Sequence, residues 1–79
     1  MNIQIYTTQY CPYCSKAKAL LTSLGLTYQE IDVEHDQKLR EEMIQKTGHM
    51  TVPIILIDDV FIGGYDDLAI LHAKGELVK

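Results

Sequence analysis

The stretch TTQYCPYCSKAK, residues 7–18, holds both cysteines of the 79-residue chain and marks a change in its sequence pattern. The residues before it alternate with a period of two, as in a β-strand, in the order Ile3, Gln4, Ile5, Tyr6 and Thr7. After Pro12 the apolar residues recur at helical spacing, at Cys14, Ala17, Leu20, Leu21 and Leu24. Gly25 is the expected end of this helix. We therefore predict a strand that leads through the cysteines directly into a helix.

The middle of the chain predicts a second strand and a second helix. Residues 26–34 have a strand pattern that places Ile31 and Val33 on one face. Asp36 is the expected N-cap of a helix that Gly48 ends. The apolar edge of this helix is narrow and consists of Leu39, Met43 and Ile44.

The last third of the chain predicts a hairpin and a third helix. Residues 52–58, VPIILID, form a β-branched strand that the acidic pair 58–59 turns into a second strand, VFI. A helix follows over residues 66–75, with Asp66 or Asp67 at its start, Lys74 in its last turn and Gly75 as its end. The predicted order is β-α-β-α-β-β-α.

This order predicts one α/β domain over residues 1–79, with a four-stranded mixed sheet flanked by helices. The first β-α-β unit is expected to make a right-handed crossover, so its two strands are parallel. The hairpin then adds antiparallel strands. In such sheets the functional crevice lies beyond the carboxyl ends of the parallel strands. Cys11 follows the first strand and falls in that crevice.

The two cysteines are expected to differ in reactivity. Cys11 stands at the N-cap position, and Pro12 suits the first helical turn because its missing N–H would have no partner there. The free amides and the positive end of the helix dipole point at the Cys11 sulfur, so its pKa is expected to lie below that of a free cysteine. Cys14 lies one turn further, on the apolar stripe. One thiol can attack a disulfide while the other resolves the mixed disulfide.

Three other roles for the cysteine pair compete with redox chemistry. A structural disulfide across so short a loop constrains the unfolded chain very little. A zinc site needs two more ligands, and His35, His49 and His72 show no paired spacing. A purely structural core role fits Cys14 but not Cys11, which lies outside the apolar stripe. The motif and its context favour a redox pair, and no metal is expected.

Composition limits the other functions. The formal net charge of −4 argues against a nucleic-acid surface. The apolar run VPIILI is far shorter than the roughly 20 residues of a membrane helix. The first ten residues have no basic segment followed by an apolar one, so no secretory signal is expected. We expect a cytoplasmic protein, and in a reducing compartment paired thiols are more often catalytic or metal-binding than structural.

The chain resembles the dithiol glutaredoxins in the order and spacing of three separated segments, CPYC, TVP and GGYDD. The resemblance covers essentially the whole chain. It implies a thioredoxin-like fold and an enzyme that reduces glutathione mixed disulfides and protein disulfides with glutathione as co-substrate. The implied partners are glutathione, glutathionylated proteins and disulfide-containing proteins, with ribonucleotide reductase as one candidate. A monomer is expected.

The resemblance also implies the roles of individual residues. Cys11 is the nucleophile and Cys14 the resolving thiol. The Val52-Pro53 bond is cis, so that the Val52 backbone pairs with the substrate as an added strand would. The amides near Asp66 hold the γ-glutamyl carboxylate of glutathione, and the Asp67 side chain holds its ammonium group. The implied glutathione-binding residues are Tyr13, Arg40, Thr51, Val52, Pro53, Gly64, Tyr65, Asp66 and Asp67.

The residues alone also allow simpler interpretations of these motifs. Pro53 can be an ordinary trans proline at a strand start, since only about 5–6% of X–Pro bonds are cis in folded proteins. The segment GGYDD can be a glycine turn before an acidic helix cap. Arg40 can be a solvated charge on a helix face. The sequence also departs from the family that it resembles, because Thr8 stands where many glutaredoxins have a lysine that binds the glycine carboxylate of glutathione.

Three rival functions share parts of this sequence pattern. An electron donor reduced by thioredoxin reductase would usually lack the GGYDD segment. An iron–sulfur carrier would use the first cysteine and bound glutathione, but such relatives commonly have glycine or serine where this chain has Pro12. A binding module with an inert thiol pair would give Cys11 a pKa close to that of a free cysteine.

Overall fold

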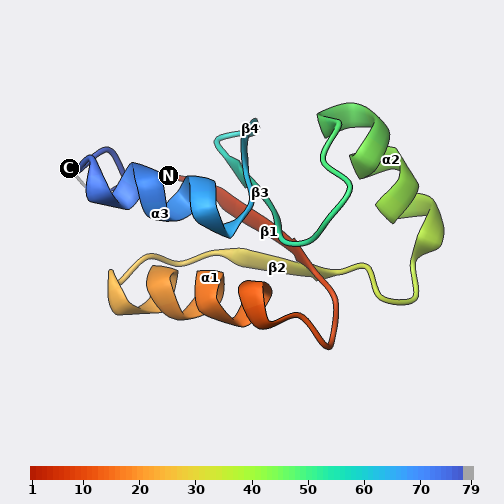
Figure 1. The fold of residues 1–79 in the computed structure, drawn as a ribbon, viewed down its shortest axis with the longest axis horizontal. Helices are drawn as coiled ribbons and strands as arrows, with labels where there is room; N and C mark the ends of the chain where they lie inside the picture. The colour runs from red at the N-terminus through yellow and green to blue at the C-terminus, as the bar shows by residue number, and fades with distance from the viewer. Residues whose placement is uncertain (78–79) are drawn as a thin grey trace.

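The structure, a computed structural model, describes residues 1–77 and has the predicted order of elements (Figure 1). The elements are β1 (Ile3–Thr7), α1 (Pro12–Ser23), β2 (Gln29–Asp32), α2 (Gln37–Thr47), β3 (Ile54–Ile57), β4 (Val60–Gly63) and α3 (Tyr65–Ala73). Within residues 1–77, none of the helices combines the length and the apolar character needed to cross a membrane.

The sheet has the strand order β2-β1-β3-β4. β1 and β2 are parallel, whereas β1 with β3 and β3 with β4 are antiparallel, which confirms the predicted mixed sheet. The hairpin turns at Asp58 and Asp59, whose φ angles of 50° and 66° are those of a tight two-residue turn. Asp58 also exchanges two hydrogen bonds of 2.7 Å with the backbone of Asn2, which ties the turn to the start of β1.

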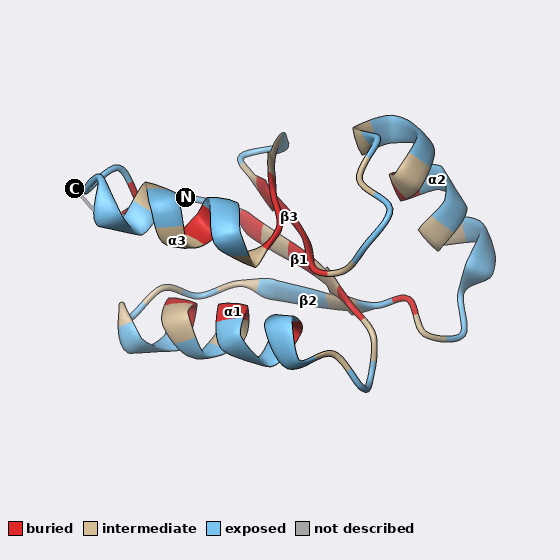
Figure 2. Cartoon of the chain, in the orientation of Figure 1, coloured by how far each residue is buried: buried red, intermediate tan, exposed pale blue. Residues whose placement is uncertain are grey.

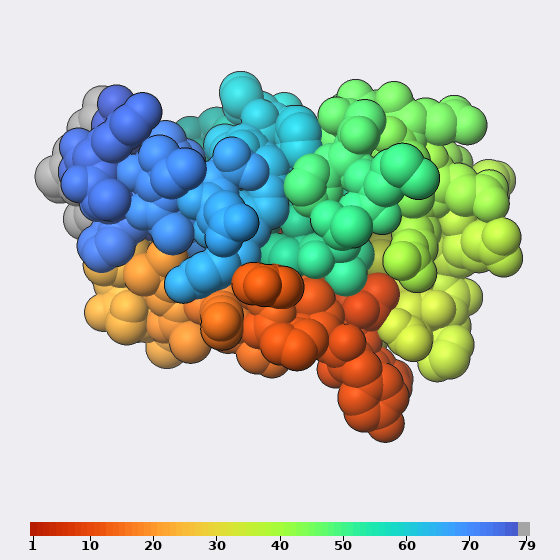
Figure 3. Space-filling view, viewed as in Figure 1, coloured from red at the N-terminus to blue at the C-terminus, as the bar shows by residue number. Residues whose placement is uncertain are grey.

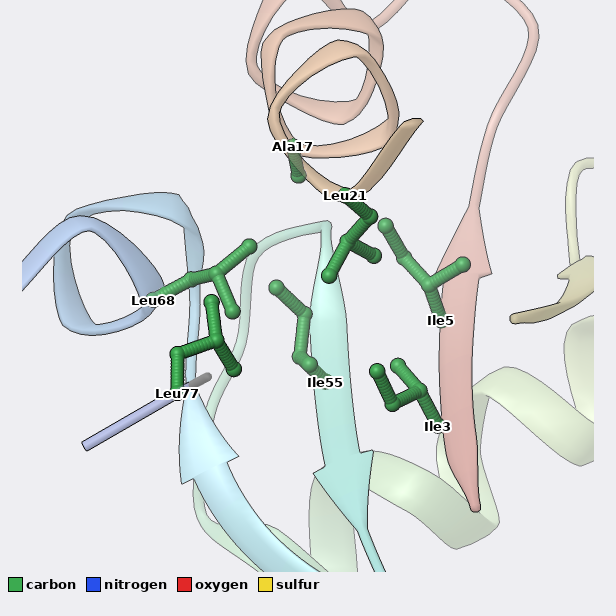
Figure 4. Close-up of a cluster of buried hydrophobic side chains, with 7 residues drawn as sticks. All are labelled: Ile3, Ile5, Ala17, Leu21, Ile55, Leu68 and Leu77. Atoms are coloured by element: carbon green, nitrogen blue, oxygen red, sulfur yellow. The ribbon is translucent and has the colours of Figure 1, made fainter. Parts of the chain in front are cut away.

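Two hydrophobic clusters lie on opposite faces of the sheet, because neighbouring strand residues point to opposite sides. The larger cluster joins the sheet to α1, α3 and the segment after α3, and Figure 4 shows its residues: Ile3, Ile5, Ala17, Leu21, Ile55, Leu68 and Leu77. The smaller cluster joins the sheet to α2 through Met43, Ile54 and Leu56. Figure 2 shows that the buried residues follow β1, β3 and the inner sides of α1 and α3. The sheet is therefore flanked by helices on both faces.

The ends of the first two helices are those that the sequence predicts. Cys11 is the N-cap of α1, and Gly25 follows its end with a φ of +72°. Asp36 caps α2 by accepting a hydrogen bond of 3.1 Å from the Leu39 N–H, and Gly48 ends it in the left-handed conformation.

Three predicted elements differ from the structure in their limits, and one of them is β3, which is shorter than the predicted strand 52–58. α3 begins at Tyr65 with Gly64 as its N-cap, so neither Asp66 nor Asp67 is the cap. Asp67 instead reaches back from the third helical position, where its Oδ2 accepts a hydrogen bond of 3.1 Å from the Gly64 N–H. β2 is shorter than the segment 26–34, because only four of its residues pair with β1.

Candidate active site

Cys11 and Cys14 lie at the start of α1, just after β1 and at the carboxyl end of the parallel strand pair. The two residues are joined as a disulfide, with 5.2 Å between their Cα atoms. The helical turn that separates them places the two sulfur atoms within bonding distance of each other. The pair can therefore form a disulfide within one chain.

The surroundings of the two sulfur atoms differ as predicted. Cys11 is partly exposed, whereas Cys14 is only 1% exposed and packs on the buried side of α1. The Cys14 backbone N–H donates a hydrogen bond of 3.0 Å to the Cys11 Sγ. This amide is one of the free donors at the start of the helix, and a hydrogen bond to sulfur favours its ionised form. Of the two sulfur atoms, that of Cys11 is thus the more accessible and accepts the hydrogen bond from the helix start.

The loop before β3 lies against the cysteines. The Cys11 Sγ is 3.7 Å from the carbonyl oxygen of Val52, which comes from a segment 41 residues further along the chain. The Val52-Pro53 peptide bond is cis, as the resemblance implies, and Pro53 is buried. A substrate that reaches the Cys11 sulfur therefore also meets the Val52 backbone.

A pocket of about 250 Å³ opens between α1, the loop before β3 and the start of α3. In Figure 3 the orange surface of the cysteine segment borders the green surface of the loop around residue 50 and the blue surface of the start of α3. The residues that line the pocket are Tyr13, His49, Thr51, Val52, Pro53, Gly64, Tyr65, Asp66 and Asp67. Tyr13 and Tyr65 form one wall, with 6.2 Å between their ring centroids.

The glycine pair before α3 is required by close contacts. Gly63 has a φ of +123°, and a Cβ at this position would overlap the carboxylate of Asp67. A Cβ on Gly64 would lie 3.3 Å from the Nε2 of His49 and 3.5 Å from the carbonyl oxygen of Pro53. Larger residues would push the Asp67 side chain or the His49 ring out of place. The two glycines thus set the shape of the pocket.

The structure brings together eight of the nine residues predicted to bind glutathione and leaves out Arg40. Arg40 lies on α2 and lines a second pocket, of about 410 Å³, formed with Val33, Glu34, Gln37, Glu41 and Ile44. This pocket shares no lining residue with the first. The helix pattern gave the face of α2 on which Arg40 lies, but not its distance from the cysteines.

His49 lines the first pocket and was not among the predicted site residues. Its Nε2 is 3.2 Å from the Thr51 hydroxyl, and its ring centroid is 5.7 Å from that of Phe61. A single histidine in a polar loop has no periodic pattern to mark it. The one available signal was its position two residues before Thr51.

A model of the glutaredoxin family matches residues 3–62, which is more than half of the chain and includes both cysteines and the cis proline. The chain belongs to the glutaredoxin family. It is 51% identical over 76 residues to glutaredoxin 3 of Escherichia coli K12, covering 96% of this chain and 92% of that protein. It is 45% identical over 75 residues to a glutaredoxin of Pseudomonas aeruginosa, covering 95% and 89% of the two chains.

Solved glutaredoxin structures share the fold. A buckwheat glutaredoxin–glutathione complex matches with a TM-score of 0.92 and 34% identity, over 96% of this chain and 72% of that one. A glutaredoxin from Brucella melitensis matches with a TM-score of 0.86 and 44% identity, over 98% and 84% of the two chains. The thioredoxin-like fold is therefore confirmed, and this glutaredoxin is a thiol–disulfide oxidoreductase.

One ion pair braces the helix that carries the cysteines of this glutaredoxin. The Nζ of Lys18 on α1 is 2.9 Å from the Glu30 Oε2 on β2, and the buried hydroxyl of Thr7 on β1 donates a hydrogen bond of 2.8 Å to the same oxygen. The hydrogen bond from Lys18, and next that from Thr7, hold the pKa of the Glu30 carboxyl below its ordinary value of 4.5, against the opposing effect of burial. Three elements thus meet at one carboxylate.

Over residues 1–77, no group of three or more histidine, cysteine, aspartate or glutamate side chains is arranged to hold a metal ion.

Proposed function

We propose that this glutaredoxin uses glutathione to reduce glutathione mixed disulfides and protein disulfides through Cys11 and Cys14. The observation that carries the proposal is the pocket: eight predicted glutathione-binding residues line it, and the carbonyl oxygen of one of them, Val52, is 3.7 Å from the Cys11 sulfur. The buckwheat relative was solved as a complex with glutathione, which supports the same ligand here.

In the proposed complex the glutathione peptide lies along the Val52 backbone with its sulfur at Cys11. The backbone amides at the start of α3, near Asp66, hold the γ-glutamyl carboxylate, because free amides at a helix N-terminus bind anions. The Asp67 carboxylate holds the ammonium group. Tyr13 and Tyr65 wall the pocket, Thr51 and Pro53 also line it, and Gly64 lets the peptide approach the backbone.

Removal of glutathione from a protein needs only one cysteine in this scheme. The Cys11 thiolate attacks the glutathione sulfur of the mixed disulfide, and the protein leaves as a thiolate that takes up a proton. A glutathione thiolate then attacks the Cys11–glutathione disulfide, releasing glutathione disulfide and restoring the Cys11 thiolate.

Reduction of a protein disulfide uses both cysteines. Cys11 attacks one substrate sulfur and the other leaves as a thiolate. Cys14 then loses its proton and attacks the Cys11 sulfur, which releases the second substrate thiolate and leaves the Cys11–Cys14 disulfide seen in the structure. Two glutathione molecules restore the dithiol and become glutathione disulfide. Each exchange moves one electron pair.

The proposal extends to the setting in which the enzyme works. Reduction by glutathione fits the cytoplasm, since that compartment keeps thiols reduced. We expect the enzyme to work there as a monomer. Protein disulfides such as that of ribonucleotide reductase are candidate substrates. Tyr10, next to Cys11 in the sequence, is 91% exposed, and Met50, next to Thr51, is 75% exposed, so both side chains are available to contact a protein substrate.

A coupled assay tests the source of electrons. A glutathionylated peptide is offered with glutathione and glutathione reductase, or with thioredoxin reductase alone, and NADPH consumption is followed. We expect turnover only with glutathione and glutathione reductase. Equal turnover with thioredoxin reductase alone would overturn the glutathione dependence.

Variants of Asp67 test the pocket. Asp67→Asn keeps an oxygen that can accept the hydrogen bond from the Gly64 N–H but loses the charge, whereas Asp67→Ala loses both. We expect both to raise the KM for the glutathionylated peptide by about tenfold, the low end for a hydrogen bond between charged groups. An unchanged KM in Asp67→Asn would mean that Asp67 serves the helix only. The role of Arg40 in glutathione binding stays a prediction, and the KM of Arg40→Ala in the same assay tests it.

A further inference from the structure

A pocket that binds glutathione needs a positively charged group to balance the carboxylates of the ligand. Glutathione carries two carboxylates and one ammonium group. Of the nine lining residues, Asp66 and Asp67 are acidic, Tyr13 and Tyr65 are phenols, and the others apart from His49 have no ionisable side chain. His49 is therefore the one lining residue whose side chain can become positively charged.

The imidazole of His49 has two side-chain neighbours, and a further hydrogen bond fixes the backbone of the residue. Its backbone N–H donates a hydrogen bond of 3.1 Å to the Thr47 hydroxyl, its ring lies against Phe61 of β4, and its Nε2 is 3.2 Å from the Thr51 hydroxyl. The ring is partly buried and borders Gly64, the N-cap of α3. It therefore stands beside the amides at which a carboxylate would bind, rather than pointing into solvent.

We propose that His49 is a substrate-binding residue that supplies the positive charge for a carboxylate of the glutathione moiety, so that affinity depends on its protonation. The inference rests on the proposed function, because it concerns the same pocket. A histidine changes its charge between about pH 5 and 8. Binding of the carboxylate is then strengthened as pH falls through that range and weakened as pH rises.

Protonation also changes the neighbouring hydroxyl. A neutral imidazole can accept the Thr51 proton at Nε2, which occupies that proton. A protonated imidazole can only donate, so Nε2 gives its hydrogen to the Thr51 oxygen, and the hydroxyl proton is free to turn toward a ligand. One added proton thus supplies both a charge and a hydrogen-bond donor. The other titratable groups of the pocket are Asp66, Asp67, Tyr13 and Tyr65.

The test uses a ligand that cannot exchange disulfides. S-methylglutathione is titrated by NMR into the oxidised protein, whose two cysteines are joined, at about pH 5.5 and about pH 8. The variants are His49→Gln, which removes the charge, and His49→Lys, which keeps a cation at both pH values. His72→Gln, on the exposed side of α3, is the matched control.

We expect the Kd of the wild type to be lower at the acidic pH by about two- to fivefold relative to His49→Gln, the range of a partly exposed ion pair. His49→Lys is expected to lose the difference between the two pH values while keeping its affinity, and His72→Gln to behave as the wild type. With the diethyl ester of S-methylglutathione, which lacks both carboxylates, the wild type and His49→Gln are expected to bind equally.

Two results would overturn the inference in distinguishable ways. If His49→Gln follows the wild type at both pH values while Asp67→Asn weakens binding, the pocket takes glutathione but His49 carries no charge to it. If the wild type shows no saturable binding at either pH, the proposed function itself is wrong, and the role of His49 with it.

Discussion

Two cysteines one helical turn apart have different surroundings, and we propose that they therefore have different tasks. Cys11 is reached from solvent and accepts a hydrogen bond from the helix start, whereas Cys14 is buried behind it. A buried thiol cannot meet an incoming protein disulfide first. It can attack a disulfide formed at its neighbour, since the helix holds the two sulfur atoms within bonding reach.

Replacing each cysteine in turn separates these tasks. We expect Cys14→Ser to keep or raise the rate of deglutathionylation, because Cys11 alone completes that cycle. Reduction of a protein disulfide is expected to slow by at least about tenfold, since the intramolecular attack with its high effective concentration is lost. Both rates are measured with a glutathionylated peptide and a disulfide-bonded protein.

Cys11→Ser is the counterpart of that experiment and is expected to abolish both activities. If Cys14→Ser lost deglutathionylation as completely as Cys11→Ser, the assignment of nucleophile and resolving thiol would be wrong. A structural role for the pair would then explain the data better.

At the level of elements, Glu30 couples the stability of the cysteine helix to pH. The pKa of Glu30 is lowered in the folded protein, first by Lys18 and then by Thr7. Its stabilising effect is therefore present above the pKa of the unfolded chain and is lost as pH falls through the folded-state pKa. Both partners of the ion pair are partly exposed, at 31% and 39% of their side-chain surface, so the effect is that of a surface pair.

We expect the free energy of unfolding of the wild type to exceed that of Glu30→Gln by about 0.2–1 kcal/mol at neutral pH. The difference is expected to vanish at a pH below the titration of Glu30. Urea unfolding at a series of pH values measures it. Glu42→Gln, an exposed charge on α2, is the control and is expected to show no such difference. A gap that persists in acid would point to packing rather than charge.

The sequence predicted the elements better than the contacts between them. Period and end residues are local, so β1, α1 and α2 were expected with nearly their observed limits. The start of α3 was misplaced because an aspartate at the third helical position stabilises a helix start as well as one at the cap does. β2 is shorter than its pattern because pairing along an edge depends on the neighbouring strand.

The site was predictable where residues sit in motifs and not where the fold alone brings them together. Cys11, Cys14 and the segments around Pro53 and Gly64 are marked by neighbours in the sequence. His49 enters the pocket because its ring packs on Phe61, from a strand twelve residues later. Arg40 falls in another pocket because of the way α2 crosses its face of the sheet, which no local pattern specifies.

At the level of the whole molecule, the core is completed by a residue near the end of the described chain. Leu77 is 1% exposed and lies with Leu68 and Ile55 in the larger cluster (Figure 4). It follows α3 and lies beyond the region that the family model matches. The last residues of α3 and the turn after it therefore belong to the folding unit.

We expect Leu77→Ala to lower the free energy of unfolding by about 2–4 kcal/mol, the cost of a cavity in a packed core. Urea denaturation measures it. Ile70→Ala, at a side chain that is 52% exposed on α3, is the control and is expected to change stability by no more than about 0.5 kcal/mol. Similar values for the two variants would show that the end of the chain adds nothing to the core.

The unequal size of the two clusters has a consequence for motion. α1 contributes three buried residues to the protein interior, whereas α2 contributes only Met43. We expect amide protons of α2 to exchange with deuterium through a partial opening that costs less than global unfolding, while those of β1 and β3 exchange only when the whole chain unfolds. Native-state hydrogen exchange at low urea measures both, and a common opening free energy would contradict this.

Such an opening would release the loop from residue 48 to residue 52, which joins α2 to β3 and carries one side of the pocket. α1, which carries the disulfide, would stay folded, because it is anchored in the larger cluster. The protein would then be mobile at the loop that lines the proposed glutathione pocket and rigid at the helix that carries the two cysteines.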